Sequence, residues 1–248
     1  MTARTIVLSC ENMQKYYGQQ LILYDINLEL SQGELVSILG QSGTGKTTLF
    51  NVLTGMDQDA SGTVFRGSRI GYMLQKDMLL PWKRLIDNVA LPFVLAGESK
   101  KTARGKAESY LSVFGLQGLA YRYPSQLSGG QRRRAAFLRT YLYSRNLMLL
   151  DEPFTGLDAI TRGQLYEWLL EHKEKLGISI LLITHDIEEA IALSDRIYVL
   201  SQGPPSTLWP PLQVKTNSGA DEKPDPAKWR EQTENLREEI RRRIFTVI

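Results

Sequence analysis

The chain has 248 residues, of which 42% are apolar and 23% charged, and its formal net charge is +3. This composition is typical of soluble globular proteins and excludes collagenous, disulfide-scaffold and wholly disordered chains. The length suits one domain with a short appendage, and the small positive excess does not indicate a nucleic-acid partner.

The sequence indicates neither membrane insertion nor secretion. It has no run of about 18 apolar residues, so we expect no membrane-spanning helix. Near the N-terminus only Ile6, Val7 and Leu8 are consecutively apolar, which is too short for a signal peptide. The single cysteine, Cys10, excludes an internal disulfide and suits a half-buried strand position in a reducing compartment. We therefore expect a cytoplasmic protein.

The first third of the chain is predicted to form strands, at residues 5–8, 21–30 and 35–39. The third of these is almost continuously apolar, which is typical of a strand buried on both faces. A glycine-rich turn follows it, and then a helix from about residue 46 to 53. Residues 81–143 are mainly helical in pattern, with breaks at Gly97, Gly115 and Gly118.

The second half alternates strands and helices. Strands are expected at 147–150, 179–184 and 196–200, and helices at about 160–176 and at 187–193. Such alternation predicts an α/β fold with a mostly parallel sheet covered on both faces. The helical block at about 76–145 lies between two such units, so we expect it to be an inserted helical subdomain.

The composition changes after Ser201. Residues 204–248 are predicted to form a proline-rich linker and a last helix at about 227–245. The helix carries an apolar stripe of Trp229, Leu236, Ile240 and Ile244. The run 241–243 is basic and could contact a membrane or nucleic acid, but acidic residues directly precede it, which favours a solvated helix end.

A phosphate-binding motif follows the buried strand at 35–39. Residues 40–47 match the pattern G-x-x-x-x-G-K-[ST] and open a helix. Glycines allow backbone N–H groups to surround a phosphate, and the helix N-terminus adds partial positive charge. In such a loop Lys46 reaches the β- and γ-phosphates and Thr47 binds Mg²⁺. The predicted nucleotide-binding residues here are Gly40, Gln41, Ser42, Gly43, Thr44, Gly45, Lys46, Thr47 and Thr48.

Two carboxylates end the buried strand at 147–150. Asp151 is placed to hold Mg²⁺, and Glu152 to polarise the attacking water as a general base. Alone, an apolar run that ends in Asp-Glu also fits an ordinary boundary between strand and turn. Together with the phosphate-binding motif it indicates a nucleotide hydrolase.

A third motif identifies a family. Residues 127–131 read Leu-Ser-Gly-Gly-Gln and precede a helical run, so Ser128 is expected to cap that helix. With this motif the sequence resembles the ATP-binding cassette (ABC) ATPases over about residues 5–203. The resemblance implies nucleotide contacts by Ser128, Gly129, Gly130 and Gln131.

Further positions match the family in order. Tyr17 resembles the aromatic residue that stacks on adenine, although it also fits a core tyrosine at a strand edge. Gln75 resembles the glutamine that senses Mg²⁺ and the γ-phosphate, and Asp158 resembles the aspartate that lies at the dimer interface. His185 resembles the switch histidine that contacts the γ-phosphate. His172, on a charged helix, is expected to be an ordinary surface residue.

The resemblance implies a P-loop (RecA-like) fold with an N-terminal antiparallel β subdomain. It implies ATP as the nucleotide, with Mg²⁺ held by Thr47, Gln75 and Asp151, and hydrolysis that uses Glu152, Gln75 and His185. It also implies a head-to-tail homodimer in which the loop 40–48 of one cassette faces residues 128–131 of the other. One departure is Thr155-Gly156, where Ser-Ala is common in the family.

Residues 75–82 and 87–89 are similar to cassettes of the nitrate, sulfonate, taurine and thiamine-precursor importers. This implies a subunit at the cytoplasmic face of the membrane that works with a polytopic permease and, indirectly, a solute-binding protein. Pro81 and Trp82 then lie near the groove for the permease, or else Trp82 is a buried residue at a helix start. An exporter or lipid-extracting complex is the alternative, and a non-transport ABC ATPase a remote one.

Overall fold

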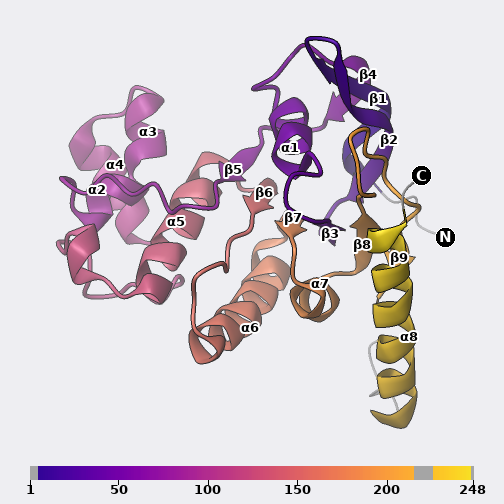
Figure 1. The fold of residues 1–248 in the computed structure, drawn as a ribbon. Helices are drawn as coiled ribbons and strands as arrows, with labels where there is room; N and C mark the ends of the chain where they lie inside the picture. Colours follow the sequence, from indigo (N-terminus) through magenta and orange to yellow (C-terminus); the bar gives the residue numbers. More distant parts are fainter. Residues whose placement is uncertain (1–4, 215–225, 247–248) are drawn as a thin grey trace. The chain divides into compact units, whose positions relative to one another are not determined.

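The computed structural model describes residues 5–214 and 226–246. They form two compact units: the described residues of Met1–Ser68 and Ser179–Ile248 make up unit 1, and Arg69–Ile178 makes up unit 2. Figure 1 shows the elements of both units in chain order. Among the described residues, no helix combines the length and the apolar character that crossing a bilayer requires.

Unit 1 contains an antiparallel sheet of three strands in the order β2-β1-β4, which are β1 (Ile6–Tyr17), β2 (Gln20–Ser31) and β4 (Ser61–Arg66). The sequence predicted only the first residues of β1 and missed β4. Asn12 lies at φ 50°, and the pairing of β1 with β2 shifts between Cys10 and Met13. This bulge interrupts the alternation of buried and exposed residues, which is why the alternating pattern predicted too short a strand.

Unit 1 also contains parallel strands. β3 (Leu35–Leu39) pairs on one side with β7 (Ser179–Thr184) and on the other with β8 (Arg196–Val199), while β9 (Leu212–Gln213) runs antiparallel at the edge of β8. Every residue of β3, β7 and β8 is buried, as the continuous apolar runs predicted. Helices α1 (Lys46–Thr54) and α7 (Ile187–Leu193) follow β3 and β7 and agree with the predicted helices.

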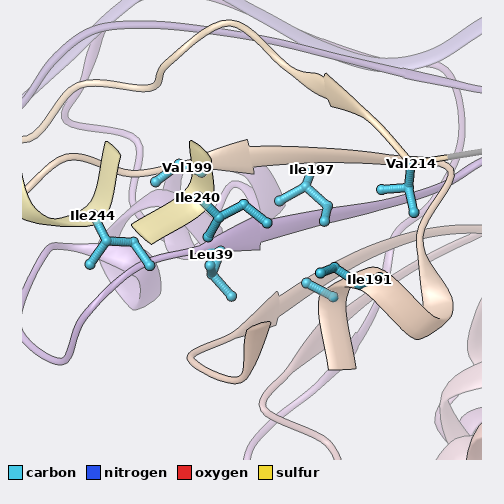
Figure 2. Close-up of a cluster of buried hydrophobic side chains, with 8 residues drawn as sticks. Leu39, Ile191, Ile197, Val199, Val214, Ile240 and Ile244 are labelled. Carbon is cyan, nitrogen blue, oxygen red and sulfur yellow. The ribbon is translucent and has the colours of Figure 1, made fainter. Parts of the chain in front are cut away.

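Helix α8 (Pro226–Phe245) closes the core of unit 1 (Figure 2). Its Ile240 and Ile244 are buried and Leu236 packs beside them, so these three positions of the predicted stripe are confirmed. The side chain of Trp229 and residues 215–225 of the predicted linker lie outside the described part of the chain. In the basic run, Arg242 is exposed and pairs with Glu239, whose pKa is lowered to about 2 by Arg242 and Arg243. Arg241 and Arg242 are solvated, as predicted, but Arg243 is half-buried and donates to the carbonyl of Pro210 at 2.6 Å, so the prediction of a solvated helix end holds only for the first two residues of the run.

Unit 2 contains two parallel strands, β5 (Gly71–Met73) and β6 (Leu147–Asp151), together with most of the helices. The sequence predicted β6 and the helical character of this region but did not assign β5. The predicted boundaries of the helical insert, about 76–145, stay a prediction. The helices are α2 (Leu85–Val89), α3 (Leu91–Leu95), α4 (Lys100–Glu108), the 3₁₀ helix η1 (Pro124–Gln126), α5 (Gly129–Tyr143) and α6 (Ala159–Leu176).

The core of unit 2 is rich in aromatic side chains, and His172 belongs to it. His172 stacks on Trp168 with ring centroids 4.6 Å apart, and its Nδ1 and Nε2 lie 2.8 Å and 2.7 Å from the carbonyl oxygens of Trp168 and Val113. Phe114 also packs on Trp168. The expectation of an ordinary surface histidine is therefore wrong: the residue is half-buried and joins α6 to the segment after α4.

Candidate functional site

The loop between β3 and α1 has the geometry of an anion cradle. Gly43 and Gly45 lie at φ +84° and +91°, a region that other residues rarely adopt. No side chain caps α1 and its first turn holds no acidic residue, so no residue of that turn competes with an anion for its N–H groups. The Nζ of Lys46 is buried and donates to the carbonyls of Gly40 and Gln41 at 2.8 Å and 2.7 Å. Thr47, the second residue of α1, is exposed. These residues fit a nucleotide phosphate.

His185 follows the strand next to the phosphate loop. Leu39 and Thr184 are register partners at the ends of the parallel strands β3 and β7. Gly40 and His185, which follow them, therefore lie at the same edge of that sheet. His185 is exposed there. The next residue, Asp186, accepts hydrogen bonds from the backbone N–H groups of Glu188 and Glu189 and so caps α7. The fold of unit 1 thus brings the predicted switch histidine to the edge that carries the phosphate loop.

Tyr17, the predicted adenine contact, ends β1 in the same unit. Half of its surface is exposed, which excludes the alternative of a core tyrosine. Its hydroxyl lies 3.5 Å from Asp57, and the Nζ of Lys15 lies 4.9 Å from its ring centroid. Lys15 lowers the pKa of Asp57 and its own pKa is raised in turn, so this pair stays charged and fixes the surroundings of the ring.

Unit 2 brings together two predicted catalytic residues, Gln75 and Glu152, with the predicted Mg²⁺ ligand Asp151 beside them. Met73 and Leu150 are register partners in the pair β5–β6. Gln75 therefore follows the strand next to β6, which ends at Asp151 and is followed by Glu152. The side chain of Gln75 donates to the carboxylate of Glu152 at 3.1 Å. Glu152 has φ +43°, a strained conformation of the kind that concentrates at functional sites. Gln75 and Glu152 therefore form one polar cluster, with Asp151 next to it in sequence.

Two hydroxyl groups complete this carboxylate cluster. Thr155 donates from Oγ1 to Glu152 at 3.3 Å. The hydroxyl of Tyr72 lies 3.5 Å from the Oδ2 of Asp151, and burial raises the pKa of Tyr72. Tyr72 is therefore neutral and able to donate to a carboxylate. The cluster presents carboxylate oxygens, which are suitable ligands for Mg²⁺ and suitable acceptors for a proton from water.

Residues 127–131, called the signature loop below, lead into α5, and Ser128 caps that helix as predicted. Ser128 accepts from the N–H of Gln131 at 3.2 Å, and the side chain of Gln131 accepts from the N–H of Ser128 at 2.9 Å, which is a capping box. The two glycines between them also pack closely on neighbouring residues. A Cβ on Gly129 would lie 3.2 Å from Leu157, and one on Gly130 would lie 3.0 Å from Thr161. The family resemblance assigned these glycines to contact with the nucleotide. This packing is a second reason for a residue without a side chain at both positions.

Asp158, the predicted interface aspartate, caps α6 by accepting from the N–H of Thr161 at 2.9 Å. These hydrogen bonds from Thr161 lower the pKa of Asp158. Thr161 packs against Gly130 and also donates its N–H to the capping Asp158. The signature loop and the start of α6 are therefore packed together. Thr155-Gly156, which depart from the family pattern, lie in the turn just before it.

A cavity of about 500 Å³ in unit 2 is lined by residues 75–77, which include the predicted catalytic Gln75, and by residues at the start of α5. Arg133 lines it; this side chain is buried and donates to the carbonyl of Thr155 at 3.3 Å, and burial lowers its pKa. Sequence reasoning missed Arg133, since it treated the arginines 132–134 only as part of a helix. The lining residues are Gln75, Lys76, Asp77, Gly129, Arg132, Arg133, Thr155, Gly156 and Leu157.

A phosphate loop between a buried strand and a helix, with paired carboxylates at the end of a second strand, defines a P-loop nucleotide hydrolase. Residues 23–155 match the family model described as ABC transporter, and the chain belongs to this family. It is an ABC-type ATPase with an α/β fold.

Curated relatives share most of the chain. The formylaminopyrimidine import ATP-binding protein ThiZ of Halalkalibacterium halodurans is 43% identical over 191 residues, which are 76% of this chain and 77% of that protein. The taurine import ATP-binding protein TauB of Escherichia coli O157:H7 is 42% identical over 210 residues, 82% of each chain. The aliphatic sulfonates import ATP-binding protein SsuB 1 of Paracoccus denitrificans is 40% identical and covers 79% of this chain and 80% of its own.

Solved structures give the same family. The dimeric structure of MJ0796, a bacterial ABC transporter cassette, has a TM-score of 0.71 and 28% identity and covers 84% of this chain and 99% of that one. MJ0796 has also been solved as a post-hydrolysis dimer bound to ADP and Pi, with a TM-score of 0.70 and 26% identity over the same shares of the two chains.

Proposed function

We propose that this chain is the ATPase subunit of an importer, which hydrolyses ATP to ADP and phosphate and drives a small solute through a separate permease. The observation that supports this most directly is the identity of 40–43% with three import ATP-binding proteins over more than three quarters of the chain. Because these relatives are named as import subunits, import is preferred over the exporter and non-transport alternatives.

The site residues take distinct roles in this proposal. The loop 40–48 holds the phosphates, with Lys46 moving from its two carbonyl acceptors to the β- and γ-phosphate oxygens. Tyr17 stacks on the adenine, and the Lys15–Asp57 pair beside it supports the ring. Thr47, Gln75 and Asp151 are the residues that would hold Mg²⁺, which neutralises phosphate charge when it is bound.

Glu152 is the proposed general base. Its carboxylate accepts hydrogen bonds from Gln75 and Thr155, so its orientation is fixed before a substrate binds. A carboxylate held in this way orients the attacking water and accepts its proton. His185 contacts the γ-phosphate from the loop after β7, and its exposed position beside the phosphate loop supports this role.

The active form in this proposal is a head-to-tail homodimer. Ser128 is exposed while Leu127 next to it is buried, so the start of α5 is available to a ligand bound on a second copy. Its residues 128–131 would complete the site around the γ-phosphate, with Asp158 at the interface. The dimeric structures of MJ0796 support a dimer of cassettes. Loss of the γ-phosphate removes charge-assisted hydrogen bonds and separates the two copies.

The proposed docking surface for the permease lies in unit 2. Trp82 is 71% exposed, so the alternative of a buried tryptophan at a helix start is wrong. Met78 and Leu95 are also exposed, so apolar side chains are presented to solvent near α2 and α3. We assign this surface to the cytoplasmic part of the permease. The subunit is then peripheral at the cytoplasmic face of the membrane, and a solute-binding protein acts on it only indirectly.

The decisive experiment compares Glu152→Gln with wild type. We expect E152Q to bind ATP but to lose hydrolysis by about a hundredfold or more, because the general base is gone. We also expect it to form a stable dimer with ATP in size-exclusion chromatography with light scattering. Glu167→Gln, on the exposed face of α6, is the matched control and should hydrolyse like wild type.

Lys46→Ala separates binding from hydrolysis in the same assay. Removal of the ammonium group should weaken ATP binding in calorimetry and so prevent the dimer, since no γ-phosphate is held. Undiminished hydrolysis by E152Q would refute the assignment of the base, and unchanged ATP affinity of K46A would refute the phosphate cradle.

A further inference from the structure

Helix α8 shares a buried cluster with the strand that leads into the phosphate loop and with the helix that follows the switch histidine. Its Ile240 and Ile244 belong to one buried cluster with Leu39 at the end of β3 and with Ala190 and Ile191 of α7 (Figure 2). Leu39 directly precedes the phosphate loop, and α7 begins two residues after His185. The C-terminal helix therefore contributes to the support of both segments within unit 1.

A polar contact fixes α8 to the first turn of α7. Arg237 donates from Nε and Nη2 to the two carboxylate oxygens of Glu188, both at 2.7 Å, in a bidentate fork. A second acceptor, Glu234, lies on α8 itself at 2.9 Å from Nη1. The side chain of Arg237 is 28% exposed, and its pKa is raised by both carboxylates, so it is charged throughout the working pH range. The fork fixes the direction as well as the distance between the helices.

Glu188 is joined to His185 by a short rigid path. The carboxylate of Asp186 caps the N–H groups of Glu188 and Glu189, and the N–H of Asp186 donates to the hydroxyl of Thr184. His185 lies between Thr184 and Asp186 in the chain. A shift of the first turn of α7 therefore moves the backbone that carries His185, because the cap transmits it.

We infer that α8 positions His185 for hydrolysis and that Arg237 is the positioning residue, acting through its fork on Glu188. The inference rests on the proposed role of His185 at the γ-phosphate. An exposed ion pair contributes little to global stability, whereas a small displacement of a group at the reacting phosphate has a large effect on rate. We therefore expect removal of the fork to lower the turnover number clearly and the melting temperature only slightly.

The test is a double-mutant cycle on the full chain, measured as kcat and KM for ATP and as the melting temperature. Arg237→Gln should lower kcat by about fivefold and leave KM within about twofold, because Lys46 and its loop bind the nucleotide. Glu188→Gln should give the same loss, and the pair E188Q/R237Q no more than either alone. Arg242→Gln is the matched control, since the fork of Arg242 on Glu239 stays within α8.

His185→Ala distinguishes positioning from general support. It should lower kcat strongly, and R237Q added to H185A should lower the residual rate no further. The inference is overturned if R237Q and R242Q behave alike, or if R237Q lowers kcat by the same factor with and without His185. If H185A leaves hydrolysis unchanged, the assigned role of His185 fails and the inference fails with it, while loss of hydrolysis in E152Q would still support the ATPase site.

Discussion

At the scale of single residues, Gly130 is a position where packing and the expected contact with a nucleotide both require a residue without a side chain. A Cβ there would lie 3.0 Å from the Cγ2 of Thr161, which is tighter than ordinary van der Waals contact. We expect Gly130→Ala to lower the free energy of unfolding by about 1 kcal/mol, because overpacking exceeds the gain in helix propensity. Chemical denaturation of purified protein measures this change.

Two variants separate the causes. Thr161→Ser removes Cγ2 but keeps the hydroxyl, so G130A/T161S should recover the loss relative to T161S alone. Gly105→Ala is the matched control in α4, where nothing lies within 4 Å of the added Cβ, and it should stabilise by about 0.5–1 kcal/mol. A destabilisation by G130A that persists in the T161S background would contradict the packing explanation.

Residues differ in how far the sequence reveals them. The loop around Lys46 was predictable from spacing alone, since phosphate binding needs glycines and a helix start in a fixed order. Gln75 and His185 have no local pattern of their own and were found only through resemblance to a family. Arg133 and Arg237 were missed. Arg237 contacts Glu188, which lies 49 residues earlier in the chain, and no periodicity links such positions.

At the scale of elements, an ion pair joins α2 to α4. Asp87 is bound by Arg104 in a bidentate fork with both distances 2.8 Å, and its side chain is 11% exposed. The hydrogen bonds from Arg104 lower the pKa of Asp87 below its ordinary value of 3.8. The stabilisation is therefore fully present above pH 3.8 and is lost as the pH falls through the lower folded-state pKa.

Asp87→Asn should lower the free energy of unfolding at neutral pH by about 1 kcal/mol, a modest value because Arg104 is partly exposed. The difference from wild type should stay constant down to the ordinary pKa of the carboxyl and shrink in more acidic solution. Denaturation curves over a pH series measure it. Glu108→Gln, on the exposed face of α4, serves as the control; a gap that persists in strong acid would argue against the pair.

Three elements, β3, β7 and α7, were predicted with the bounds that the structure shows. β3, β7 and α7 are bounded by abrupt changes from apolar to polar residues, and the structure confirms these limits. β4 was missed because most of its residues are exposed and show no buried alternation. β5 has three residues, too few for a period to be recognised, and its partner β6 lies more than 70 residues later in the chain.

At the scale of the whole molecule, the exposed surface around Trp82 predicts association with a membrane protein. Trp82→Ala should abolish co-purification of a polytopic permease from native membranes and the stimulation of ATPase activity by that permease, because a large apolar anchor is removed. Tyr24→Ala, an exposed aromatic in unit 1, is the control. Basal hydrolysis by W82A should match wild type. Retained co-purification would assign the permease contact to another surface.

Unit 1 is built from both ends of the chain, which has a consequence for synthesis on the ribosome. β3 pairs with β7 and β8, yet all of unit 2 is translated between them. At about 5–20 residues per second, the mostly apolar strand β3 lacks these neighbours for on the order of ten seconds. During that interval the nascent phosphate loop has no sheet to anchor it, and the emerging strand is open to chaperones or to wrong pairing. Helix α8, which is translated after β7 and β8, then covers the core that these strands complete.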